Sequence, residues 1–142
     1  MAYATVQDMI DRFGATEMLR LSDPENRTAE TIVAAKVELA VADASALIDD
    51  YLRERYAVPL AAPPASVTRA ACTLARYDLA KGERTFPTEQ MQADRKDVIA
   101  WLASIASGKV SIDAPGKTAG GGAGPRFEDR EPAFSDRSLR GW

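Results

Sequence analysis

The side chains in this sequence that suggest acid–base or metal chemistry are its paired carboxylates, Asp49 with Asp50 and Asp94 with Asp97. Such pairs serve hydrolases as acid and base, and they bind divalent cations. Adjacent carboxylates diverge on a helix, however, and acidic pairs are common on solvated helix faces. We therefore interpret both pairs as surface charge and expect no metal site.

Nucleophilic catalysis has little support in the sequence. The chain of 142 residues has no histidine and one cysteine, Cys72, which excludes a Ser-His-Asp triad, a Cys-His pair and a thiolate zinc cluster. Cys72 lies within a predicted helix, where we expect a small buried hydrophobe. The serines lack a neighbouring base, although a lysine from elsewhere in the fold stays open as one. We predict that the protein is not an enzyme and needs no cofactor.

Nucleotide and nucleic-acid binding are also weakly supported. The GGGAG run at 120–124 lacks the Lys-Ser/Thr of a phosphate-binding loop and the flanking strand and helix, so we interpret it as linker. Arg69 and Arg76 share one helix face but have few basic neighbours, and the net charge is -3. A small helical DNA-binding regulator therefore stays as the alternative function. Intersubunit or core-edge ion pairs are the favoured role for these arginines.

The elements that position these residues are predicted to be helices. About 26 residues are alanine, which favours helix and allows helices to approach closely. Thr5 and Asp8 predict a capping box for a short helix from Val6 to Phe13, which Gly14 ends. A brief helix is expected over 16–21, and strong helices over 29–55, over 65–79, and from Thr88 to Gly108.

The 29–55 helix is expected to be the spine of the bundle. Its apolar residues recur at three- and four-residue steps and predict a buried face, whereas its charged residues predict a solvated one. The buried face comprises Val37, Val41, Ala44, Ile48, Tyr51 and Leu52, and the solvated face Lys36, Asp43, Asp50 and Glu54.

The chain divides into three parts by composition. Residues 1–108 are predicted to form an acidic all-α bundle of four to five helices. Residues 109–125 combine a short strand at 110–113 with a glycine-rich linker. Residues 126–142 carry too few apolar residues for a core and read either as a solvated tail or as a docking peptide that becomes ordered on a partner. We favour docking, and its candidate residues are Arg126, Phe127, Phe134, Arg137, Leu139, Arg140 and Trp142.

Four segments, considered in order, resemble the Mu-type phage Gp36-like family over residues 3–112. They are YATVQDMIDRFG near the start, ADASALIDDYLRERYAVPL in the middle, RAACTLARYDL after it, and DVIAWLASIASGKVSI. The ending FSDRSLRGW is similar to Phe-Ser…Gly-aromatic endings of phage structural proteins. The residues of the resemblance that we expect to form a structural motif are Asp43, Ile48, Asp49, Tyr51, Arg55, Tyr56, Pro59, Leu60, Arg76 and Tyr77.

The resemblance implies a head-tail connector, or adaptor, in the neck of the virion. Such subunits form rings beneath the portal protein, usually of twelve copies. The expected partners are therefore further copies of the chain, the portal, a tail-proximal neck or tail-terminator protein, and transiently the passing DNA. The resemblance implies no catalysis. No signal peptide or membrane span is expected at the N-terminus, so assembly would take place in the host cytoplasm.

Overall fold

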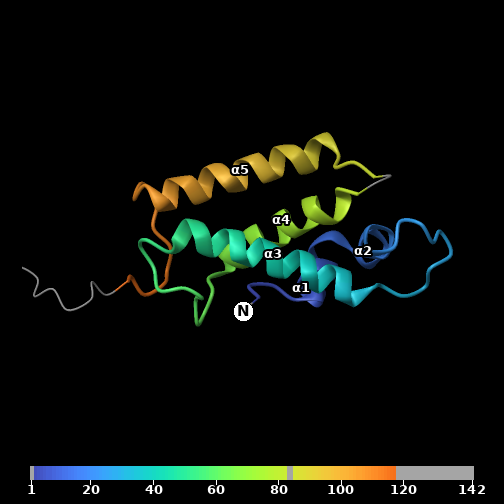
Figure 1. The fold of residues 1–142 in the computed structure, drawn as a ribbon, viewed down its shortest axis with the longest axis horizontal. Helices are drawn as coiled ribbons and strands as arrows, with labels where there is room; N and C mark the ends of the chain where they lie inside the picture. Colours follow the sequence, from blue (N-terminus) through green and yellow to red (C-terminus); the bar gives the residue numbers. More distant parts are fainter. Residues whose placement is uncertain (1, 83–84, 118–142) are drawn as a thin grey trace, which may run out of the picture.

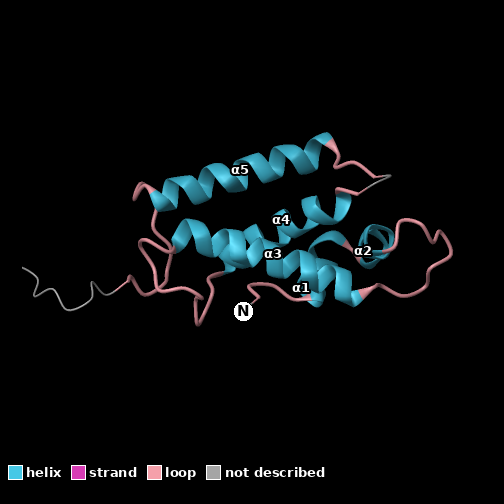
Figure 2. Cartoon of the chain, in the orientation of Figure 1, coloured by secondary structure: helices cyan, strands magenta, loops and turns pink. Residues whose placement is uncertain are grey.

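The computed structural model describes residues 2–82 and 85–117. Within them the chain forms five helices, and Figure 2 draws helices and loops without any strand. The helices are α1 (Val6–Phe13), α2 (Ala15–Ser22), α3 (Ala34–Leu52), α4 (Ala65–Ala80) and α5 (Glu89–Ala106). The predicted small all-α fold is confirmed.

The short helices begin and end where local chemistry predicts. The Thr5 hydroxyl accepts a hydrogen bond from the Asp8 amide at 3.1 Å, and the Asp8 carboxylate accepts one from the Thr5 amide at 2.9 Å, which together form the capping box. Gly14 ends α1 with φ +91°, a conformation that a side chain would strain. Thr88 caps α5 by accepting from the Met91 amide at 3.2 Å. These three predictions are confirmed.

The spine is shorter than predicted, because α3 spans Ala34–Leu52 rather than 29–55. Before it, the Val33 amide donates to the hydroxyl of Ser22 in α2 at 3.1 Å, and the Asn26 side chain accepts from the Thr28 amide at 3.2 Å. These contacts hold the preceding segment in a non-helical path. The prediction of a strand at 110–113 is wrong, since this part of the described chain has no neighbouring strand with which to pair. It contains one isolated bridge, between Tyr56 and Gly116.

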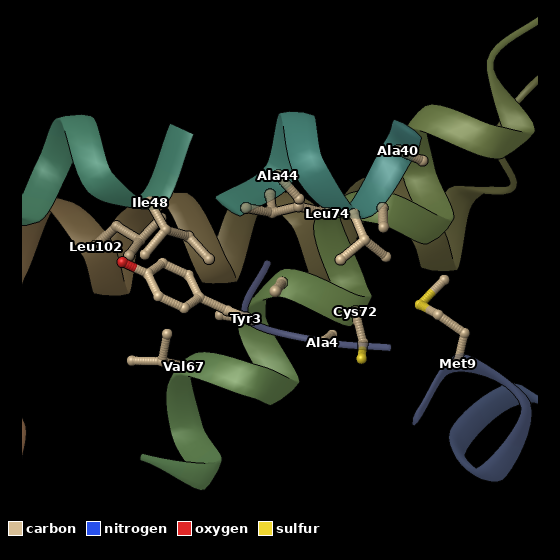
Figure 3. Close-up of a cluster of buried hydrophobic side chains, with 14 of the residues drawn as sticks. Tyr3, Ala4, Met9, Ala40, Ala44, Ile48, Val67, Cys72, Leu74 and Leu102 are labelled. Carbon is tan, nitrogen blue, oxygen red and sulfur yellow. The ribbon is translucent and has the colours of Figure 1, made fainter. Parts of the chain in front are cut away.

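The core lies mainly between α3 and α4, and α5 packs across both of them (Figure 1). Alanines fill much of this interface and let the two helices approach closely. Larger side chains from α3, α4 and α5 lie around Tyr3, among them Ile48, Val67 and Leu102, while Met9 of α1 lies at the other side of the cluster (Figure 3). The buried alanines of α3 and α4 include Ala40, Ala44, Ala70, Ala71 and Ala75.

Candidate interaction surfaces

Tyr3 joins the N-terminal segment to two other parts of the bundle. Its amide donates to the Ser45 hydroxyl of α3 at 2.9 Å, and its own hydroxyl donates to the Asp49 carboxylate. The same hydroxyl accepts from the Leu60 amide at 2.9 Å. Burial, and then the hydrogen bond to Asp49, raise the pKa of Tyr3 to about 12. Ser45, Asp49 and Leu60 therefore join the N-terminal segment to α3 and to the segment that follows it.

Arg55 and Tyr56 hold the segment that leads into the tail, and we call their contacts the latch. The Arg55 guanidinium donates through Nη1 to the carbonyl oxygens of Ile105 at 2.6 Å and Val110 at 3.0 Å. The Arg55 carbonyl accepts from the Lys117 amide at 2.8 Å, and the Tyr56 hydroxyl accepts from the Ile112 amide at 3.0 Å. The latch thus caps the end of α5 and fixes residues 110–117 to the body.

The other residues of the predicted structural motif differ in how far their side chains are buried. Ile48 is fully buried, whereas Tyr51 and Tyr77 are half-buried. The Arg95 guanidinium lies 4.9 Å from the centre of the Tyr77 ring. Pro59 is exposed, and the peptide bond before it is cis. The structure therefore assigns packing roles to most of these residues, while Pro59 is on the surface.

Arg76 connects α4 to the two N-terminal helices. Its guanidinium lies 2.7 Å from the Glu17 carboxylate of α2 and 4.6 Å from the centre of the Phe13 ring of α1. Both partners of the ion pair are mostly covered, so the contact is shielded from solvent more than a surface pair. Arg76 is a core-edge ion-pair donor, as predicted. Arg69 is exposed on the same helix.

Three of the grooves on the described surface differ in charge. The first, the α1/α4/α5 groove, has a volume of about 580 Å³ and is lined by Arg12 and Arg69 and by Asp94 and Asp97. The second, the arginine groove, has a volume of about 820 Å³ and is lined by Arg12, Arg20 and Arg76 with one carboxylate, Glu17. The third, the acidic groove, has a volume of about 480 Å³. Its four carboxylates outnumber its two lysines, and they are Asp23, Glu25, Asp43 and Asp78.

The structure places two of the groups that were considered for catalysis, Cys72 and Asp94. Cys72 is fully buried, and burial raises its pKa to about 11, which keeps the thiol protonated near neutrality. Asp94 accepts from the Gln90 side chain at 2.8 Å. The part of the chain that the structure describes holds no cluster of metal-ligating side chains. Its helices lack the length or the apolar run that crossing a membrane requires.

Two exposed apolar side chains were missed by sequence analysis. Leu39 of α3 is 64% exposed and Phe86, in the connection before α5, is 85% exposed. The available signals were that Leu39 lies outside the apolar face of its helix and that Phe86 stands beside Pro87 in a predicted connection. The predicted docking residues from Arg126 to Trp142 lie outside the described residues.

Comparison with known proteins identifies the family. Residues 3–128 match the family described as Bacteriophage Mu, Gp36, and the chain belongs to it. Gene product J of Escherichia phage Mu is 35% identical over 136 residues, which cover 96% of this chain and 92% of that protein. The Mu-like prophage FluMu protein gp36 of Haemophilus influenzae is 37% identical over 111 residues, which cover 78% of this chain and 74% of that protein. The chain is therefore a helical phage protein, and the expected family is confirmed.

Proposed function

We propose that the chain is a subunit of the head-tail connector, a ring of twelve copies beneath the portal that joins the capsid to the tail. The observation that carries this proposal is the latch, which fixes the start of the C-terminal segment to the helical body through Arg55 and Tyr56. A peptide attached to the body in this way can transmit force between its own subunit and the protein that the peptide binds. The role requires neither catalysis nor a cofactor.

The tail residues have the composition expected of anchors. Phe127, Phe134, Leu139 and Trp142 would each contribute on the order of 1.5–3 kcal/mol by burial, before ordering costs. Because such contacts repeat around a ring, weak single contacts combine into strong attachment. The partners we propose are copies of this chain, the portal, and a tail-proximal neck or tail-terminator protein.

The surface of the body also fits an assembled subunit. Leu39 and Phe86 expose apolar area that a neighbouring protein would cover. Asp50 of α3 and Glu54 in the turn that follows it are both exposed. A negative surface of this kind on the lumen side of a ring would keep passing DNA from adhering. We place the protein in the neck of the virion, after assembly in the host cytoplasm.

Mixing the purified full-length protein with portal and imaging the mixture by negative stain tests this proposal. Rings on the portal are expected for the wild type. The full-length variant F134S/W142S should keep its helical circular dichroism and lose attachment to the portal, whereas the matched control S135A/S138A should attach normally. Portals without added density in the wild-type sample would contradict the proposal. Normal attachment of F134S/W142S would show that these tail residues have no role in attachment to the portal.

The alternative function, a DNA-binding regulator, has one surface to support it. The arginine groove offers Arg12, Arg20 and Arg76, but Glu17 is already paired with Arg76. Duplex binding ordinarily needs several free phosphate contacts and weakens steeply with salt. Titrating full-length protein with duplex DNA at two salt concentrations separates the two functions, because tight and salt-sensitive binding would favour the regulator.

A further inference from the structure

The acidic groove has the features of a site for a cationic and apolar peptide. It lies where the α2–α3 connection, α3 and the end of α4 meet. Its apolar lining includes Leu21, Leu39 and Leu79, of which Leu39 is 64% exposed. Around these leucines stand the carboxylates of the groove. An occupant would cover the exposed leucine and place positive charge near the carboxylates.

The charge in this groove is partly uncompensated. Burial raises the pKa of the Asp78 carboxyl, and the Asp43 carboxylate adds to the rise, while Arg95 and Lys81 lower it. A guanidinium placed in the groove would therefore favour the charged form of the Asp78 carboxyl. The groove is better suited to a cation than to a neutral or acidic partner.

The C-terminal end of this chain has the matching chemistry. Residues 137–142, RSLRGW, contain two arginines, a leucine and a tryptophan, with no acidic side chain. We call this segment the basic tail end. The arginine groove would repel it, and the α1/α4/α5 groove balances two arginines against two aspartates. Charge therefore selects the acidic groove among the three described grooves.

We propose that the basic tail end of one copy docks into the acidic groove of a neighbouring copy. Leu139 and Trp142 cover Leu39, and Arg137 and Arg140 pair with Asp43 and Asp78. The proposal rests on the ring proposed above and names the contact that links its subunits. Because the tail end and the groove are different patches of the same chain, the contact is heterologous, and contacts of this type form a ring when the rotation between neighbours closes.

The chain that follows the latch is long enough to reach a neighbouring copy. The latch follows the C-terminal end of α3, whereas α2 lies toward the other end of that helix (Figure 1), and the groove includes Leu39 and Asp43 of α3. From Leu39 to Leu52 the helical rise amounts to about 20 Å. The roughly 20 residues between Lys117 and Arg137 span up to about 66 Å when extended. This reach covers the groove of the same body and that of an adjacent copy, and the ring proposed above favours the adjacent copy.

Charge reversal in the full-length protein tests the contact, with molar mass measured by sedimentation velocity. We expect the wild type to self-associate, and expect D43K and R140E each to weaken association at least tenfold. An equimolar mixture of D43K and R140E should recover association, because the reversed tail end fits the reversed groove. The controls are E54K, in the turn that follows the same helix and outside the groove, and R130E, in the tail outside its basic end. Both should associate like the wild type.

Several results would overturn the proposed contact. They are a D43K variant that associates like E54K, a mixture that recovers nothing, and a wild type that stays monomeric at all concentrations. Attachment of a monomeric wild type to portals would leave the connector function standing without this contact. If the wild type, the charge-reversal variants and their mixture associate as expected but the wild type does not bind portals, the contact stands and the connector function is refuted.

Discussion

Replacing Tyr3 with phenylalanine should destabilise the whole bundle. The change removes a single oxygen from a buried site and leaves the ring in place. That oxygen donates to the Asp49 carboxylate and accepts from the Leu60 amide, so both groups lose a partner. Tyr3 is 3% exposed, which leaves little room for water to replace the lost contacts.

The expected loss follows from these two contacts. A hydrogen bond to a charged group contributes about 1.5–3 kcal/mol, and a buried amide without a partner costs about 1–3 kcal/mol. Allowing for relaxation, the free energy of unfolding should fall by about 3 kcal/mol, a large part of the roughly 5–15 kcal/mol of a typical domain. With a urea slope of about 2 kcal/mol/M, the midpoint should shift by about 1.5 M.

Urea unfolding followed by circular dichroism at 222 nm measures this loss. Y51F is the matched control, because Tyr51 is half-buried and its hydroxyl has no hydrogen bond to another described residue. Its midpoint should stay within about 0.3 M of the wild type. A midpoint for Y3F that is equally close to the wild type would refute the structural role of the hydroxyl.

The pH dependence of stability gives a second measurement. The pKa of Tyr3 rises from 10.0 to about 12 on folding. Because the folded protein favours the protonated phenol, its contribution is complete below pH 10 and is lost as the pH rises from 10 through 12. The free energy of unfolding should fall more steeply in this window for the wild type than for Y3F. Equal slopes would contradict the raised pKa.

The remaining predictions concern the latch, the thiol and an exposed aromatic residue. R55A should lower the free energy of unfolding by about 2 kcal/mol, measured in urea, because two carbonyl oxygens lose a charged donor. The same variant should weaken ring assembly. Unchanged assembly would show that the latch is dispensable. Cys72 should resist a thiol reagent at pH 8 in the native protein and react once the protein is unfolded, and a rapid native reaction would contradict its burial. F86S should change the free energy of unfolding by less than about 0.5 kcal/mol and weaken self-association in sedimentation; normal association would mean that Phe86 faces solvent in the assembly.

Helix boundaries were predictable where neighbouring residues determine them. The bounds of α1 follow from Thr5, Asp8 and Gly14, all within ten residues of one another. The start of α3 was not predictable, because the hydroxyl of Ser22 holds the Val33 amide from another helix. The failed strand at 110–113 has the same cause, since the Ile112 amide is taken by Tyr56, 56 residues away. Contacts distant in sequence override local pattern in both cases.

The residues of the structural motif could be predicted from the sequence, but the residues that they contact could not. Its resemblance to a family marked Asp49, Arg55 and Tyr56, yet the partner of Asp49 is Tyr3, 46 residues away in sequence. The partners of Arg55 are 50 and 55 residues away. No helical periodicity identifies such pairs. The acidic groove was not predictable for a similar reason, because α2, α3 and α4 each contribute only part of it.

The contacts of the segment from Arg55 to Leu60 determine how a force on the tail would reach the helical body. Arg55 follows α3, caps α5 through the Ile105 carbonyl and binds Lys117, so one residue joins two long helices to the start of the tail. Leu60 follows a few residues later and binds Tyr3, which is tied to α3. A pull on the tail would therefore load α3 and α5 together rather than unravel the end of α5. That distribution of force suits a subunit whose tail links it to a neighbour, as proposed above.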